Sequence, residues 1–156
     1  MNKEDVARLF HEKGRTLGSV ESLTGGLFAS EITSIPGASH FFKGSFVTYA
    51  TEEKVRLLGI PYEDVDKYGV VSQEIAMEMA GHGQKLLRTD YCISFTGNAG
   101  PDAMEGKKVG TVFIAVCAYT QCVVCSFHFS GSRDEIRKQC LEKGYELLID
   151  QLLKNN

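Results

Sequence analysis

Hydrophobic positions recur at helical or strand spacing along most of the chain, and Gly, Pro and small polar residues separate the segments. Between residues 3 and 13, for example, Val6, Leu9 and Phe10 share one helical face, and Gly14 follows as a stop. The predicted elements are, in order, helices over 3–13 and 24–34 with a strand over 16–20 between them, a strand over 44–50, a helix that Thr51 caps and that ends near Gly59, a helix that Ser72 caps, strands over 91–96, 110–119 and 122–129, and a last helix that Ser132 and Glu135 open as a capping box.

Strands as apolar as these are usually buried on both faces. The pattern therefore predicts an α/β fold: a three-layer α/β/α sandwich with a mixed, largely parallel central sheet and a late antiparallel hairpin. No repeat or linker interrupts the chain, so residues 1–156 are expected to form a single domain. Ligands of such sheets lie at the carboxyl ends of strands, which points to residues 21–26 and 96–102.

Composition limits the classes of partner. Lys and Arg number 17 and Asp and Glu number 20, a net charge of −3, which argues against direct nucleic-acid binding but allows a small anionic ligand. There is no apolar run long enough to span a membrane, and the first residues lack the apolar core of a signal peptide, so we expect a cytoplasmic protein without membrane contact.

The five cysteines are odd in number and irregularly spaced, which is typical of reduced thiols. Cys122 and Cys125 form a C-x-x-C pair, but residues three apart on a strand face opposite sides and cannot easily hold one ion. The four histidines, likewise, do not have the spacing of metal ligands. We expect neither a metal nor another cofactor.

The segment Glu-Ser-Leu-Thr-Gly-Gly at 21–26 combines a hydroxyl, that of Ser22, with the free amides of a helix start and glycines that allow close approach. A hydroxyl beside unpaired N–H groups has the parts of a nucleophile and an oxyanion hole. The candidate oxyanion donors are the amides of Thr24, Gly25 and Gly26. The alternative is that Ser22 or Thr24 only caps the helix.

Lys54 falls in the first turn of a predicted helix, shortly after Tyr49 at the end of a strand. The positive field of a helix N-terminus favours the neutral amine and lowers its pKa, as a general base requires. Glu52 and Glu53 act in the opposite direction. The alternative is a solvated lysine paired with these glutamates.

The loop after the strand at 91–96 is rich in small residues whose amides can hold a phosphate, although it matches neither a P-loop nor G-x-G-x-x-G. The candidate substrate-binding residues there are Thr96, Gly97, Asn98 and Gly100. A plain tight turn is the alternative. Lys107 and Lys108 add positive charge nearby, whereas Arg133 and Arg137 are interpreted as surface charges at a helix start.

Several strings together carry a family resemblance: ESLTGG at 21–26, IPGAS at 35–39, FKGSFVTYATEEKVRLLGI at 42–60, YGVVSQEIA at 68–76, SFTGNAGPDAMEGKKVGTVFIA at 94–115 and FSGSRDEIRKQ at 129–139. In this order and spacing the chain resembles the CinA C-terminal domain / PncC nicotinamide-nucleotide amidase family. The resemblance covers almost the whole chain.

This resemblance implies hydrolysis of the carboxamide of nicotinamide mononucleotide to nicotinate mononucleotide and ammonia. It implies an α/β/α fold, no metal, and a catalytic serine, tyrosine and lysine, which fall on Ser22, Tyr49 and Lys54 by motif position. It also favours a homo-oligomer, and the apolar pair Phe41-Phe42 or the strand after Cys122 could supply a dimer contact.

The chain differs from the residues common in the family at a few positions, none of which is Ser22, Tyr49 or Lys54. Leu23 stands where many members have Cys, Ala50-Thr51 replaces a frequent Ser-Asn, and Ser45 and Lys108 replace Gly and Pro. The nucleotide-pyrophosphatase-like domain of longer members is also absent from this sequence. The chain can therefore be a stand-alone amidase or a piece of a longer protein.

A second function class stays open at this point. A non-catalytic nucleotide-binding or interaction module, linked to competence or to the DNA damage response, would keep the glycine-rich loops and bind a ligand without turnover. Such a module needs none of Ser22, Tyr49 and Lys54, so the presence of all three favours the enzyme. An amidase for another pyridine or purine nucleotide is a third possibility.

Overall fold

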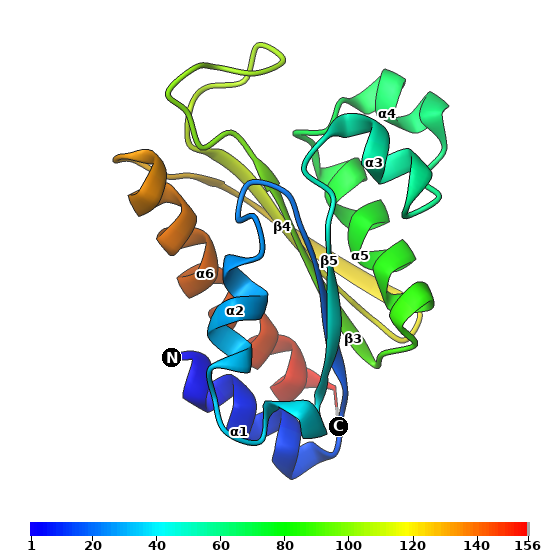
Figure 1. Cartoon of the computed structure of the whole chain (residues 1–156), viewed down its shortest axis with the longest axis vertical. Coiled ribbons are helices and arrows are strands. Elements are labelled where there is room, and N and C mark those ends of the chain that lie inside the picture. Colours follow the sequence, from blue (N-terminus) through cyan, green and yellow to red (C-terminus); the bar gives the residue numbers. More distant parts are fainter. Residues whose placement is uncertain (156) are drawn as a thin grey trace.

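A five-stranded sheet forms the centre of the computed structural model, which describes residues 1–155 (Figure 1). The strands lie in the order β2-β1-β3-β4-β5. Their bounds are Leu17–Glu21 (β1), Phe42–Val47 (β2), Tyr91–Gly97 (β3), Thr111–Ala118 (β4) and Gln121–His128 (β5). β2, β1 and β3 run parallel, whereas β4 and β5 form an antiparallel hairpin beside β3. The predicted mixed sheet with its late hairpin is confirmed.

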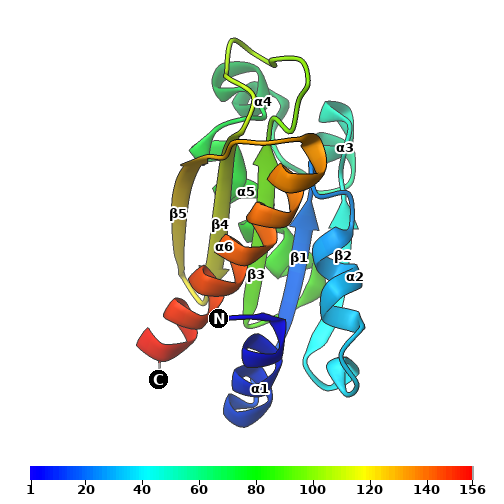
Figure 2. The ribbon, with the colours of Figure 1, turned by 90° about the vertical axis from the view of Figure 1, so that its left-hand side faces the viewer.

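Helices cover both faces of the sheet and complete the predicted three layers (Figures 1 and 2). One face carries α1 (Lys3–Lys13), α2 (Leu27–Thr33) and α6 (Arg133–Lys154). The other carries α3 (Thr51–Arg56), α4 (Tyr62–Tyr68) and α5 (Gln73–Leu87). A short 3-10 helix, Ala38–His40, precedes β2. In Figure 2 the parallel strands point toward the end of the molecule where α3 and the start of α6 lie.

The core lies on both sides of the sheet because successive strand residues point to opposite faces. Phe95 of β3 packs on the α2 and α6 side, with its ring 5.3 Å from that of Phe28, whereas Cys92 packs toward α5. A glycine brings α6 close to the sheet: a Cβ at Gly144 would lie 2.8 Å from the Phe95 ring. This close packing fixes α6 across β3, so that its N-terminal turn reaches the carboxyl edge of the sheet.

Several predicted helix boundaries are confirmed by the capping contacts. Gly14 ends α1 in the left-handed conformation, with φ of 63°. The Ser72 hydroxyl accepts the Ile75 N–H at the start of α5. At the start of α6, Ser132 and Glu135 form a capping box in which each side chain accepts the main-chain N–H of the other.

Two predicted boundaries around the motifs are wrong. The helix expected from Thr24 begins at Leu27, because Gly25 and Gly26 adopt left-handed conformations with φ of 57° and 96° that no helix continues. Thr51 was expected to cap α3 but is its first residue, and Ala50 holds the cap position without a side-chain bond.

Two elements near the motifs also differ in extent from the prediction. β2 ends at Val47, so Tyr49 lies beyond the strand that was expected to reach Ala50. The α4 helix was not predicted, although Pro61 before it and two acids in its first turn, Glu63 and Asp64, are the usual signals of a helix start.

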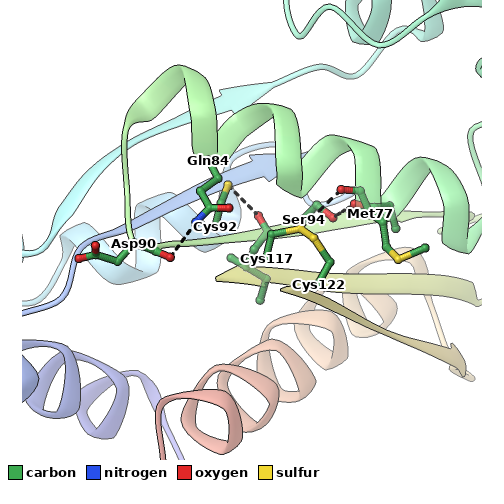
Figure 3. Close-up of a disulfide and its surroundings, with 9 residues drawn as sticks. Met77, Gln84, Asp90, Cys92, Ser94, Cys117 and Cys122 are labelled. Atoms are coloured by element: carbon green, nitrogen blue, oxygen red, sulfur yellow. Dashed lines mark hydrogen bonds between the residues drawn. A yellow bond between two sulfur atoms is a disulfide. The ribbon is translucent and has the colours of Figure 1, made fainter. Parts of the chain in front are cut away.

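The prediction that all five cysteines are reduced is wrong for one pair: Cys117 and Cys122 form a disulfide across the β4–β5 hairpin (Figure 3). The antiparallel register places these two residues directly opposite each other, on the α5 side near Met77. Cys125 is a free thiol three residues further along β5. Strand alternation places it on the other face, so the C-x-x-C pair is split between the faces as expected.

The packing decides which of the apolar segments suggested as dimer contacts lie at the surface. Of the apolar pair suggested as a dimer contact, Phe41 is buried and stacks on Phe10, with ring centroids 5.6 Å apart, whereas Phe42 is only partly buried. The strand after Cys122, β5, is one edge of the sheet. Among the helices described, none is long and apolar enough to cross a bilayer.

Candidate active site

Ser22 lies at the carboxyl end of β1, the strand between the two other parallel strands. Its N–H donates to the Phe95 carbonyl of β3 at 3.0 Å, which extends the strand pairing by one residue. The chain then turns through Gly25 and Gly26 into α2. The side chain of Ser22 is thereby held at the sheet edge, where clefts of α/β proteins form.

The carboxylate of Glu21 organises this turn and is fully buried. It accepts hydrogen bonds from three main-chain N–H groups at the start of α2 and from three hydroxyls. The donors are the amides of Gly26 (3.1 Å), Phe28 (3.0 Å) and Ala29 (3.0 Å) and the hydroxyls of Thr24 (2.8 Å), Ser19 (3.2 Å) and Ser45 (3.3 Å). An anion at the free amides of a helix start is electrostatically favourable, so Glu21 fixes the turn after Ser22.

Helix capping by Ser22 or Thr24 is therefore not what the structure shows. Gly26 holds the cap position without a side-chain bond, and Glu21 accepts the free amides instead. Sequence reasoning assigned Glu21 no role. The signal that could have found it is a carboxylate at the end of a fully buried strand, immediately before a glycine-rich helix start.

We expect Glu21→Gln to lower the free energy of unfolding by about 3 kcal/mol. The glutamine NH₂ group would face N–H donors and leave buried amides without an acceptor. Urea denaturation measures the loss, and Glu31→Gln, which affects a surface ion pair of α2 with Lys3, is the matched control. A Glu21→Gln protein as stable as the control would contradict the structural role of this carboxylate.

Lys54 lies on α3, the helix that follows β2, and its side chain reaches Ser22 at the end of the neighbouring strand β1. The ends of β1 and β2 emerge at one edge because Glu21 pairs with Val47 in the register. From α3 the Lys54 side chain, only 1% exposed, contacts the Ser22 Oγ with its Nζ at 3.1 Å. Lys54 Nζ also donates to the carbonyl oxygens of Thr48 at 2.5 Å and Tyr49 at 3.5 Å.

The alternative of a solvated lysine paired with glutamates is therefore wrong. Burial lowers the pKa of the Lys54 amine to about 8, while the charges of Glu105 and Glu52 act to raise it. Glu53 pairs instead with Arg56 on the surface. A buried amine that is readily neutral, in contact with a hydroxyl, has the arrangement that a general base and its nucleophile require.

A cleft of about 360 Å³ opens beside Ser22. Five segments line it: Ser22 and Leu23 after β1, Tyr49 and Thr51 around the start of α3, Val70 and Val71 before α5, residues 96–102 with Met104 after β3, and Arg133 of α6. The predicted Thr96, Gly97, Asn98 and Gly100 are all among its walls. Thr24, Gly25 and Gly26 are not, because the turn carries them behind Ser22 toward α2.

Some main-chain N–H groups of the turn after Ser22 are hydrogen-bonded, and others have no acceptor among the described residues. The Gly25 N–H donates to the Ser22 carbonyl and the Gly26 N–H to Glu21, so two of the three predicted oxyanion donors are occupied. Within residues 1–155 the N–H groups of Leu23 and Thr24 have no acceptor. The free donors thus lie one or two residues after Ser22.

Asn98 shapes the loop that follows β3. Its side-chain oxygen accepts the Gly100 N–H at 3.1 Å, and its side-chain nitrogen donates to the Lys107 carbonyl at 3.2 Å. Its main chain pairs with Thr111 and Gly110 on the return to β4. Asn98 is almost fully buried, so it acts mainly on the shape of this cleft wall.

Two arginines of α6, which the sequence pattern indicated as surface charges, make hydrogen bonds at the site and at the turn after Ser22. Arg133 donates to the Gly100 carbonyl at 2.5 Å and to the Tyr49 hydroxyl at 2.9 Å. Arg137 donates to the Thr24 carbonyl at 3.0 Å. These contacts join residues more than 30 positions apart, so no local pattern signals them.

Tyr49, Lys107 and Lys108 differ in how they relate to the cleft. Tyr49 is 62% exposed, and its hydroxyl accepts a hydrogen bond from Arg133, whereas Lys54 contacts only the Tyr49 carbonyl. Lys107 donates to the Val71 carbonyl, and Lys108 borders a separate depression that includes His128. Among the described residues, no three His, Cys, Asp or Glu side chains are grouped as metal ligands.

Comparison with known proteins places this chain in a family. The sequence model of the CinA C-terminal domain matches residues 1–152. A CinA-like protein of Flavobacterium psychrophilum is 42% identical over 151 residues, and a putative competence-damage inducible protein of Bacillus subtilis is 46% identical over 141. These alignments cover 96% and 90% of the chain but only 36% and 34% of the relatives, so the chain spans about a third of their length.

Solved structures agree over the full fold. A CinA-superfamily protein of Klebsiella pneumoniae superposes with a TM-score of 0.95 at 26% identity, covering 99% of both chains. The competence/damage-inducible protein CihA of Agrobacterium tumefaciens has a TM-score of 0.89 at 32% identity, covering 95% of this chain and 94% of its own. The chain therefore belongs to the CinA C-terminal domain family.

Proposed function

We propose that the protein hydrolyses the carboxamide of nicotinamide mononucleotide to nicotinate mononucleotide and ammonia. The observation that carries the proposal is the buried contact of 3.1 Å between Lys54 Nζ and Ser22 Oγ at the wall of the cleft. Structural lysines are usually solvated, and burying an amine against a hydroxyl costs stability that a catalytic role explains.

In the first step, neutral Lys54 takes the hydroxyl proton as Ser22 Oγ attacks the carboxamide carbon. The C–N bond then breaks, Lys54 returns the proton to the departing nitrogen, and ammonia leaves an acyl-serine. In the second step, water attacks the ester carbon and gives a proton to Lys54, the bond between that carbon and Ser22 Oγ breaks, and Lys54 passes the proton to Oγ. The carboxylate product then dissociates.

The negative oxygen of each tetrahedral intermediate needs preorganised donors. The free N–H group of Leu23, which lines the cleft, is our candidate, in place of those of Gly25 and Gly26, whereas Thr24 is fully buried outside the cleft. One such donor contributes roughly 3 kcal/mol to transition-state stabilisation. By holding the start of α2, Glu21 keeps this turn in place before substrate arrives.

The cleft wall supports a phosphorylated substrate. Arg133 brings a guanidinium to the side formed by Gly100 and Tyr49, where it can pair with a phosphate while the pyridine ring lies toward Ser22. In this arrangement Tyr49 positions substrate with Arg133, and Lys54 needs no tyrosine relay to reach Ser22. Asn98 and Gly97 form the wall beside the phosphate-bearing end.

Ammonia release from nicotinamide mononucleotide by the purified protein tests the proposal. A panel of nicotinamide riboside, nicotinamide and purine nucleotides separates this substrate from its relatives. Release from the mononucleotide, strongest in the panel, is the expected result. Calorimetric binding of the mononucleotide without ammonia release would instead indicate a non-catalytic nucleotide-binding module.

The pH dependence of kcat/KM is expected to follow the ionisation of Lys54. Since the base is the neutral amine and its pKa is about 8, activity should rise roughly tenfold per unit below pH 8 and level off above it. Rates measured from pH 6.5 to 9.5 avoid the phosphate ionisation of the substrate near pH 6. A flat profile across this range would contradict the assignment of the base.

A further inference from the structure

The cleft wall formed by Val70 and Val71 is held by side chains rather than by regular secondary structure. The Val70 carbonyl accepts from the Thr96 hydroxyl at 2.6 Å, and the Val71 carbonyl from Lys107 Nζ at 2.8 Å. The N–H groups of both valines donate to one carboxylate, that of Glu105. All four main-chain polar groups of this dipeptide are therefore paired with side chains.

Each carboxylate oxygen of Glu105 accepts one of these two hydrogen bonds, and both distances are 3.0 Å. It sits on loop 98–110, of which residues 98–102 and Met104 line the cleft. Gly69 permits the approach, since a Cβ there would lie 2.7 Å from the carboxylate. Charge-assisted bonds of this kind are stronger than neutral ones, so Glu105 is the main tie between the loop and the valine wall.

The same carboxylate acts on the catalytic pair. The groups facing Lys54 are the Ser22 hydroxyl from β1, the carbonyls of Thr48 and Tyr49 after β2, and two charges. Those charges are Glu105 from the loop and Glu52 from α3, and both raise the pKa of Lys54 against the effect of burial, Glu105 more strongly. Glu52 has no contact with the valine wall.

We propose that Glu105 is a positioning residue of the cleft, which ties the Val70–Val71 wall to loop 98–110. This role rests on the proposed amidase function. The negative charge of the same side chain is expected to raise the basicity of Lys54 as well.

Three variants separate the two effects. Glu105→Gln loses both the tie and the charge, so KM should rise about tenfold and the midpoint of the kcat/KM profile should fall by about half a pH unit. Glu105→Asp keeps the charge but is too short to reach both amides, so it should raise KM alone. Glu52→Gln loses only a charge, and we expect it to lower the midpoint and leave KM unchanged. A wild-type KM and midpoint in Glu105→Gln would overturn the proposal.

Two measurements without substrate distinguish failure of this proposal from failure of the proposed function. Amide hydrogen exchange at Val70 and Val71 should accelerate at least about tenfold in Glu105→Gln and Glu105→Asp but not in Glu52→Gln. An NMR titration of the Lys54 side chain should give a lower pKa than the wild-type value of about 8 in both Gln variants. If the wild type releases no ammonia, these two measurements still test the tie and the charge, and unchanged values in Glu105→Gln would refute them.

Discussion

Replacement of Ser22 by alanine is expected to lower kcat for ammonia release by roughly 10⁴-fold or more while the substrate still binds. Ser22 Oγ supplies the bond to the carboxamide carbon, and the only atom lost is the one that Lys54 contacts at 3.1 Å. The cleft walls, including Arg133, remain in place to bind the mononucleotide. Rates of ammonia release and a calorimetric titration measure the two parts of this prediction.

Ser30→Ala is the matched control for Ser22→Ala. Ser30 is an exposed residue of α2, less than one helical turn after the start of that helix, and its hydroxyl makes no hydrogen bond within residues 1–155. The control should keep the wild-type kcat. If Ser22→Ala retained more than about a tenth of the wild-type rate, a covalent acyl-serine could not be an intermediate.

Replacement of Lys54 by methionine is expected to remove nearly all activity and at the same time to stabilise the fold. Methionine has a similar length and shape but cannot take a proton, so kcat should fall about 10³-fold or more. Burial lowers the pKa of Lys54 from 10.5 to about 8, which means that the charged amine costs the folded state about 3 kcal/mol at neutral pH. Loss of the hydrogen bond to the Thr48 carbonyl offsets part of the gain.

The net effect should be a Tm about 3 °C higher than that of the wild type at pH 7. Its dependence on pH has a definite sign. The free-energy cost of the charged Lys54 amine is complete below pH 8, where the amine is charged in both the folded and the unfolded protein. It disappears by about pH 10.5, where the amine is neutral in both. The advantage of the variant should therefore shrink between these values. Lys85→Met, on the exposed face of α5, is the control and should show no such trend.

Local patterns located the candidate catalytic pair but not its environment. Ser22 and Lys54 each follow a predicted strand, and parallel strands end at one edge, which is why both reach the same place. The burial of Lys54 could not be foreseen, since Glu52 and Glu53 beside it favour a solvated lysine on pattern alone. That burial depends on tertiary packing over the end of β1, which no spacing within α3 encodes.

Contacts between distant segments account for most of what the sequence left out. Arg133 and Tyr49 are 84 positions apart, and Glu105 lies in a loop without periodicity, 35 positions from Val70. The disulfide is different, because its signal was present: Cys117 and Cys122 flank the hairpin turn at equal distances, a spacing that pairs residues across two antiparallel strands.

The position of α6 has a consequence for the newly made chain. Ribosomes add roughly 5–20 residues per second, so Arg133 and Arg137 emerge several seconds after Ser22 and Lys54. Until α6 docks over β3, a nascent polypeptide has Ser22 and Lys54 but lacks the Arg133 guanidinium in the cleft wall. Under the proposed function, turnover of a phosphorylated substrate waits until α6 has been translated and has docked.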